Sequence, residues 1–187
     1  GEATVTGSGS QWNHSGTLDV GIFGTGTLNV EAGGVVSNVL GYIGNFSGST
    51  GEATVTGSGS QWNNSAHLYV GYEGDGTLNV EAEGVVSNTL SHIGDSSGST
   101  GEATVTGSGS QWNNSQYLNV GHKGTGTLNV EAGGVVSNTT GYVGYYSDST
   151  GAVTVTGSGS KWNNSGYLFV GYEGTGTLNI MDGSVVS

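Results

Sequence analysis

Residues 1–13 read GEATVTGSGSQWN, and the same string returns at residues 51–63 and 101–113, with GAVTVTGSGSKWN at residues 151–163. The chain of 187 residues is therefore built from copies of a 50-residue unit, which occupy residues 1–50, 51–100, 101–150 and 151–187. A fixed period of this length is typical of architectures in which one small unit stacks along an axis. We expect one continuous repeat domain over residues 1–187, as part of a longer chain.

Each unit contains two related halves of about 25 residues, since residues 4–7 resemble residues 28–31. Within each half, apolar residues alternate with polar ones in short runs that are rich in valine, threonine, leucine and isoleucine. Such runs predict β-strands, and a glycine every few residues excludes helices. In the first unit the predicted strands lie at residues 3–6, 11–13, 17–20, 27–32, 35–37 and 40–43.

Three strands in each half predict a coil with three corners that stacks on its own next turn. The predicted fold is an all-β parallel β-solenoid with about 25 residues per coil and two coils per 50-residue unit. The spacing between hydrogen-bonded strands sets the rise of each coil at about 4.8 Å, which gives a rod on the order of 36 Å long. Stacking is required because a single coil cannot bury its apolar face.

The alternation within the strands also predicts which side chains face the interior. One stack contains Val5 and its equivalents, Val30, Val55, Val80, Val105, Val130, Val155 and Ile180. Another contains Leu18, Val20, Ile43 and their equivalents, Leu68, Val70, Ile93, Leu118, Val120, Val143, Leu168 and Val170. The tryptophans that recur opposite a valine in alternate coils are interpreted as core or corner residues, with sugar-binding surface residues as the alternative: Trp12, Trp62, Trp112 and Trp162.

Two polar or small residue types are expected at the corners. Glycine provides positive φ without a steric penalty, and we expect this role for Gly21, Gly24, Gly26, Gly44 and Gly48. Asn13 and Asn38 lie beside turns, where ladders of asparagine between coils would satisfy inward-facing amides.

Composition excludes several classes of partner. The formal net charge is −12, from 14 acidic residues and two lysines, so too few cations are present to neutralise phosphates. We therefore expect no nucleic-acid partner. No apolar run approaches the length of a membrane-spanning helix, so we expect no membrane insertion of this segment. The absence of cysteine excludes a disulfide scaffold.

The positions at which the copies differ are not scattered. In the first half-unit they include positions 16, 17, 19, 22 and 23, and adding 23 to each number gives positions 39, 40, 42, 45 and 46 of the second. The variable positions of successive coils therefore superpose and form one outward-facing stripe. This stripe contains every tyrosine and phenylalanine of the chain, and its candidate binding residues are Phe23, Tyr42, Phe46, Tyr69, Tyr72, His92, Tyr117, Tyr142, Tyr145, Tyr146, Tyr167, Phe169 and Tyr172.

This stripe has two interpretations. Exposed tyrosines offer a large amphipathic contact area, which favours a binding surface for a second rod, another surface protein or a glycan. Alternatively, aromatic rings on neighbouring strands stack on one another and stabilise the sheet without any ligand.

The sequence offers no catalytic, metal or cofactor site. Acidic residues recur with the scaffold, and the densest group, Glu73, Asp75, Glu81 and Glu83, matches no calcium-binding loop. The histidines, His14, His67, His92 and His122, lack metal-ligand spacing, and no serine lies in a nucleophile elbow with histidine and aspartate partners. We expect a non-enzymatic protein without a cofactor.

The repeat resembles a family found in bacterial autotransporter (type V secretion) passengers and in PEP-CTERM surface proteins. The resemblance rests on Trp-Asn-Asn-Ser at 112–115 and 162–165, Gly-Thr-Gly-Thr-Leu-Asn at 124–129 and 174–179, and Gly-Gly-Val-Val-Ser at 133–137. It implies a right-handed β-helix, export, and an adhesin-like role outside the cell or on the bacterial surface.

The expected function is therefore that of an extracellular structural rod, with adhesion or self-association through the stripe. A fibre-forming subunit, and a glycan-binding or glycan-active β-helix, are the alternatives. The unusual regularity of the copies also leaves a consensus design open.

Overall fold

The computed structural model describes all 187 residues and contains 23 strands and no helix. The strands form three parallel sheets, here named A, B and C. Sheet A contains β1 (Glu2–Thr6), β4 (Thr25–Glu31), β7 (Thr50–Thr56), β10 (Asp75–Glu81), β13 (Thr100–Thr106), β16 (Thr125–Glu131), β19 (Thr150–Thr156) and β22 (Thr175–Met181). Sheet B contains β2 (Gln11–Asn13), β5 (Val35–Asn38), β8 (Gln61–Asn64), β11 (Val85–Asn88), β14 (Gln111–Asn114), β17 (Val135–Asn138), β20 (Lys161–Asn164) and β23 (Val185–Val186). Sheet C contains β3 (Thr17–Val20), β6 (Leu40–Ile43), β9 (His67–Val70), β12 (Leu90–Ile93), β15 (Tyr117–Val120), β18 (Thr140–Val143) and β21 (Leu168–Val170).

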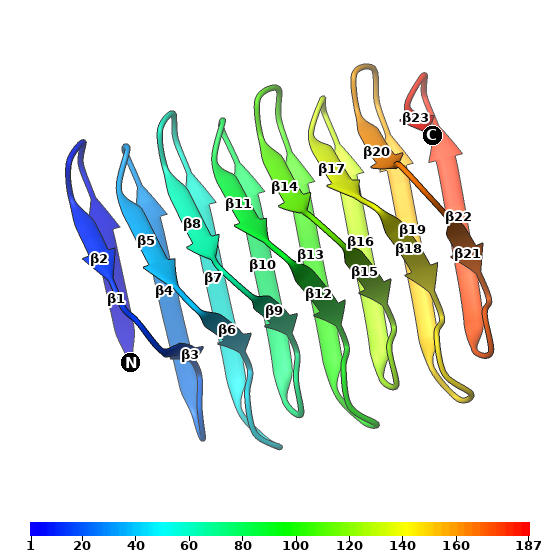
Figure 1. Ribbon diagram of the computed structural model, residues 1–187, viewed down its shortest axis with the longest axis horizontal. Helices are drawn as coiled ribbons and strands as arrows, with labels where there is room; N and C mark the ends of the chain where they lie inside the picture. The colour runs from blue at the N-terminus through cyan, green and yellow to red at the C-terminus, as the bar shows by residue number, and fades with distance from the viewer.

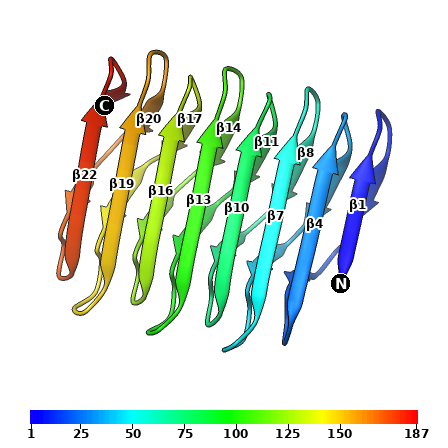
Figure 2. The ribbon, with the colours of Figure 1, turned by 180° about the vertical axis from the view of Figure 1, so that it is seen from behind.

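The chain passes through sheets A, B and C in turn and then starts the next coil, which confirms the predicted parallel β-solenoid (Figure 1). In sheet A the register is uniform, since Glu2 pairs with Thr27, and Thr27 pairs with Glu52. In Figure 2 the strands of sheet A run upward in front while successive coils move from right to left, so the coil is right-handed. The chain has no helix at all, and hence none that could cross a membrane.

The two coil types of each unit differ in the lengths of their turns. In sheet C the numbers of paired residues differ by 23 within a unit, as in Thr17↔Leu40 and His67↔Leu90. Between one unit and the next they differ by 27, as in Gly41↔Leu68, so the two steps alternate and sum to 50. The predicted alternation of two coil types is confirmed, and it explains why variable positions whose numbers differ by 23 fall on one line.

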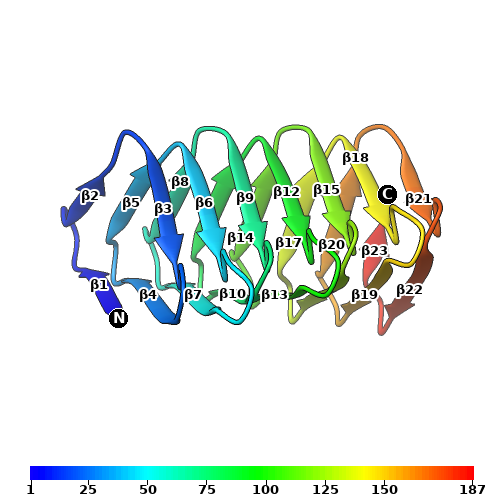
Figure 3. The same cartoon turned by 90° about the horizontal axis from the view of Figure 1, so that it is seen from below.

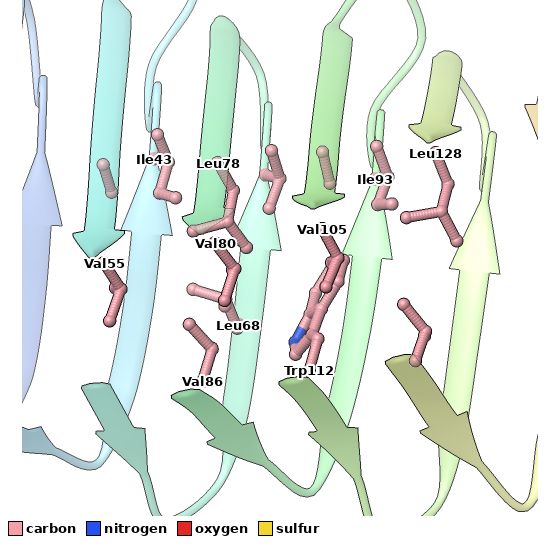
Figure 4. Close-up of a cluster of buried hydrophobic side chains, with 14 of the residues drawn as sticks. Ile43, Val55, Leu68, Leu78, Val80, Val86, Ile93, Val105, Trp112 and Leu128 are labelled. Atoms are coloured by element: carbon pink, nitrogen blue, oxygen red, sulfur yellow. The ribbon is translucent and has the colours of Figure 1, made fainter. Parts of the chain in front are cut away.

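The interior is a single cluster of 27 buried apolar residues, as expected for stacked coils. The predicted valine stack is buried from Val30 to Val155, and Figure 4 shows Val55, Val80 and Val105 repeating along it. Val5 and Ile180 are more exposed because the first and last coils have a neighbour on one side only. A further buried stack was not predicted, and it contains Leu28, Ala53, Leu78, Ala103, Leu128 and Val153.

The tryptophans of the three later units are fully buried, which confirms them as core residues, whereas Trp12 in the first coil is 37% exposed. Each buried tryptophan pairs in sheet B with valines of the neighbouring coils, as Trp112 does with Val86 and Val136. Figure 4 shows the Trp112 and Val86 side chains in the core. The Trp112 indole N–H donates to the Asn88 side-chain oxygen at 2.8 Å, and the Asn88 amide donates to Asn114 at 2.7 Å. An inward asparagine ladder is therefore present.

Two sequence-based expectations about polar and small residues were wrong in detail. Asn38 belongs to the ladder, but its partner is Asn64 rather than an equivalent of Asn13, because Asn13 is exposed and strand alternation turns the following position inward. Gly21, Gly44 and Gly48 do have positive φ, but Gly24 and Gly26 do not. Strand β4 begins at residue 25 rather than 27, so Gly26 lies within the strand. A Cβ atom at Gly26 would stand 2.1 Å from the Gly21 nitrogen, so this position needs glycine for close packing rather than for positive φ.

Candidate functional site

The variable positions lie on the outer face of sheet C and on the turn that follows each of its strands (Figure 3). Within the sheet, one row runs across all seven strands because each residue pairs directly with the next. Its members are Asp19, Tyr42, Tyr69, His92, Asn119, Tyr142 and Phe169. The row faces outward because the flanking positions, such as Leu68 and Val70, are fully buried. This is the row that the sequence predicts.

The turns after sheet C stack in the same way, through backbone hydrogen bonds such as Tyr72 N–H to the Gly44 oxygen at 3.0 Å. These bonds place two further rows beside the first. One contains Ile22, Asn45, Tyr72, Asp95, His122, Tyr145 and Tyr172. The other contains Phe23, Phe46, Glu73, Ser96, Lys123, Tyr146 and Glu173. We use the name aromatic stripe for the twelve tyrosines and phenylalanines on these rows and at the start of the strands, and all the predicted residues belong to this surface.

Every ring of the aromatic stripe contacts another ring of the stripe, and half of the rings are also half-buried. The rings of Tyr42 and Tyr69 stack with centroids 4.8 Å apart and planes 8° apart, and Tyr72 meets both edge to face at 5.1 Å. Tyr142 and Phe169 stack at 5.1 Å, and Tyr145 stands against Tyr142 at 4.7 Å. Such offset and edge-to-face pairs stabilise the sheet directly. The inner aromatics are therefore structural: Tyr42, Tyr69, Tyr72, Tyr142, Tyr145 and Phe169.

The other half of the aromatic stripe is exposed. Tyr117 and Tyr146, in coils with neighbours on both sides, expose 44% and 40% of their surface. Phe46 is 38% exposed although it stacks on Phe23 at 4.7 Å. These outer aromatics are available for contact with another molecule: Phe23, Phe46, Tyr117, Tyr146, Tyr167 and Tyr172.

A polar group interrupts the aromatic rows midway along the solenoid. His92 and Asp95 lie in one coil, and Asn119 and His122 occupy the corresponding positions of the next. His92 Nδ1 is hydrogen-bonded to Asp95 Oδ1, and His122 Nδ1 lies 3.0 Å from the same oxygen. The two imidazole rings meet edge to face with centroids 4.0 Å apart.

Although the histidines show no metal-ligand spacing in the sequence, the fold brings His92 and His122 together. Three groups able to ligate a metal, from His92, Asp95 and His122, lie within 4.8 Å of one another. The sequence spacing hides this cluster because its members come from two coils. The signal was nevertheless present, since the register that pairs Gly41 with Leu68 likewise carries position 95 onto position 122.

Burial and charge shift the pKa values of this group. Burial lowers the pKa of His92, although its hydrogen bond to Asp95 acts in the opposite direction. Burial alone would raise the pKa of Asp95, but the polar contacts and charges of His122 and His92 outweigh it and hold that pKa well below its usual range. Among the inner aromatics, burial and the neighbouring Tyr42 and Asp95 raise the pKa of Tyr69 to about 12.

The acidic residues that lie close together in the sequence, Glu73, Asp75, Glu81 and Glu83, do not form one group in the structure. Asp75 and Glu81 stand at opposite ends of β10, so Glu73 and Asp75 lie at one corner of the coil and Glu81 and Glu83 at another. Only the latter pair shares the turn that leads from sheet A to sheet B.

Comparison with known proteins gives little further information. No family model matches this chain, and no curated protein matches it. Among solved structures, it is similar to a TibA fragment described as TibC-catalyzed and hyper-glycosylated, at 17% identity over 100% of this chain and 94% of that chain. The TM-score of 0.16 is too low for this similarity to support an argument about function.

Proposed function

We propose that this chain is a non-enzymatic structural rod of a secreted or cell-surface bacterial protein, and that the outer aromatics form its contact surface. The observation that carries the proposal is that repeated positions and variable positions occupy different parts of the structure. Residues that repeat in every unit build the sheets and core, whereas residues that differ gather on one face and contain every tyrosine and phenylalanine.

The rod part of the proposal is supported by continuity. A single buried cluster runs through the chain, and each sheet continues without a break in its order of strands. Further coils of the same kind would extend such a structure without changing its cross-section, as in other solenoids. The surface and secreted location is supported by the resemblance of the repeat to passenger and surface proteins.

The contact part of the proposal is supported by exposure. Tyr117 and Tyr146 remain exposed in the interior of the stack, where neighbouring coils could have covered them. Exposed tyrosine is well suited to recognition because it combines a large apolar ring with a hydroxyl group and few rotatable bonds. The net charge of −12 opposes close approach of a second acidic surface at low ionic strength. We therefore place an uncharged glycan or a less acidic protein ahead of a second copy as the partner.

A matched pair of variants tests this proposal. The stripe variant carries Phe46→Ser, Tyr117→Ser and Tyr146→Ser. The control carries Gln11→Ser, Gln61→Ser and Gln111→Ser, which are exposed positions on sheet B. Each protein is measured on a glycan array, against immobilised surface proteins, and for self-association by sedimentation velocity.

We expect the wild type to bind in at least one assay, the control to bind equally, and the stripe variant to lose at least tenfold in affinity. Thermal unfolding of all three proteins checks that each one folds. We expect similar melting temperatures because surface substitutions usually change stability little. Equal binding by the stripe variant, or no binding by the wild type in any assay, would remove the outer aromatics from the functional account.

A further inference from the structure

The cluster of His92, Asp95 and His122 has no counterpart with the same residues elsewhere in the chain. The positions equivalent to His92 in the first and third units hold Tyr42 and Tyr142, and those equivalent to His122 hold Ile22, Tyr72 and Tyr172. The scaffold therefore does not require histidine at either position. The repeat pattern of the scaffold therefore does not explain why these residues stand together.

The arrangement of the atoms in this cluster is that of a set of ligands. The Nδ1 atoms of both histidines approach the same oxygen, Oδ1 of Asp95, and each of the three residues offers a ligand atom within 4.8 Å of the other two. His122 Nδ1 is 3.0 Å from that oxygen but is buried without an aligned hydrogen bond. Ligand atoms of a tetrahedral zinc site, with bonds of about 2.0–2.1 Å, lie about 3.3 Å apart. The distance of 3.0 Å between His122 Nδ1 and Asp95 Oδ1 is close to that separation.

An independent observation comes from Asn119, which pairs directly with His92 in the sheet and lies shortly before His122 in the chain. The residue is 5% exposed, and its side-chain oxygen Oδ1 is buried without a hydrogen-bond partner. A buried amide oxygen without a partner is costly. This unpartnered oxygen belongs to the residue that pairs with His92, one of the three members of the cluster, so a buried polar atom without a partner lies next to the cluster in sheet C.

We propose that His92, Asp95 and His122 bind one divalent transition-metal ion of the zinc class. Two imidazoles and one carboxylate suit zinc, nickel or copper, whereas calcium and magnesium prefer sets of oxygen ligands. The three side chains are 12–17% exposed, so the ion has a route from solvent. The bound ion would join two coils, because His92 and Asp95 come from one and His122 from the next.

The remaining coordination position would face outward between two groups of aromatics. Tyr69 lies on one side, with its ring centroid 5.3 Å from that of His92, and Tyr145 on the other, 5.4 Å from that of His122. Water, or a donor group on a molecule bound to the aromatic stripe, would complete the coordination.

The chain itself supplies substitutions that preserve the fold. His92→Tyr, Asp95→Asn and His122→Tyr each introduce the residue found at an equivalent position of another unit. His67→Ala is the matched control, because His67 lies on the same surface beside Tyr69 but outside the cluster. Isothermal titration calorimetry with zinc chloride alone gives stoichiometry and affinity, and the same titration with calcium chloride tests the class of ion.

We expect one zinc ion per chain with micromolar or tighter affinity, no calcium binding, and an unchanged result for His67→Ala. Each cluster variant should lose at least tenfold in zinc affinity while keeping the far-ultraviolet circular dichroism of the wild type. Cobalt absorption provides a second readout, because its intensity reports low-coordinate nitrogen and oxygen ligation in the wild type and should vanish in His122→Tyr. The proposal is overturned if the wild type binds no zinc, if His122→Tyr binds it as tightly as the wild type, or if His67→Ala abolishes binding.

Discussion

The buried asparagine ladder provides the sharpest test of how the core is held together. Replacing Asn88 by leucine keeps four heavy side-chain atoms in the same branched arrangement but removes the side-chain hydrogen bonds. Asn88 accepts from the Trp112 indole N–H at 2.8 Å and donates to Asn114 at 2.7 Å and to Ser91 at 2.8 Å. All four side chains are buried, so water cannot replace the lost bonds.

The magnitude follows from the groups left without partners. The Trp112 N–H, the Asn114 oxygen and the Ser91 hydroxyl all lose this partner, and a buried polar group without a partner costs about 1–3 kcal/mol. The expected loss for the three groups together is therefore about 3–9 kcal/mol, of which leucine recovers a part through its own burial. Against a total stability of about 5–15 kcal/mol for a typical domain, this is a large fraction.

Equilibrium urea unfolding of Asn88→Leu, Trp112→Phe and the double variant measures the effect. Trp112→Phe removes the donor, so the double variant no longer leaves that donor unpaired. The two substitutions should therefore be less than additive, with a coupling of at least about 1 kcal/mol. A loss below about 1 kcal/mol for Asn88→Leu, or strict additivity, would refute the reasoning.

Three further predictions concern other parts of the coil. Gly126→Ala should destabilise the protein by about 3 kcal/mol or more, because its Cβ would lie 2.2 Å from the Gly121 nitrogen, whereas Gly24→Ala, in open space, should be neutral in the same thermal melts. In metal-free buffer, the free energy of unfolding should fall as the pH drops below 6.5, the usual pKa of histidine, because the unfolded chain takes up a proton before folded His92 does. It should fall again below pH 3.8, because Asp95 is protonated in the unfolded chain before it is protonated in the folded one. His92→Tyr should flatten the first part of that pH profile, and an unchanged profile would contradict it. At alkaline pH the phenol of Tyr69 should ionise near pH 12, so the late phase of an absorbance titration should shrink in Tyr69→Phe. A late phase of unchanged size in this variant would show that the assignment is wrong.

The sequence was sufficient to predict the coil because its two strongest signals are local. Alternation within short strands determines which side chains point inward, and Val80 and Trp112 are buried as that alternation requires. Glycine is harder to interpret from sequence. Gly21 and Gly26 look alike there, yet Gly21 has positive φ and Gly26 lies within a strand that packs against the Gly21 backbone.

The candidate site was predictable in place but not in composition. The offset between half-units put the aromatic stripe on one face, and the register of sheet C confirms that position. The separation into inner and outer aromatics depends on ring orientation, which sequence does not specify. The cluster of His92, Asp95 and His122 depends on the other, longer register step, which joins the end of one unit to the start of the next.

Distances between spin labels test the central claim, that the variable positions of both coil types form one line. The chain has no cysteine, so two introduced cysteines would be the only sites that a spin label attaches to. The pairs to be labelled lie in the turn row that runs from Phe23 to Glu173, at positions 23 and 123, 46 and 173, and 23 and 173. These pairs are four, five and six coils apart, so the account predicts distances of about 19, 24 and 29 Å by double electron–electron resonance, rising by about 4.8 Å per coil. If the pair at 46 and 173, which joins the two coil types, instead gave a distance longer than the pair at 23 and 173, the claim would be contradicted.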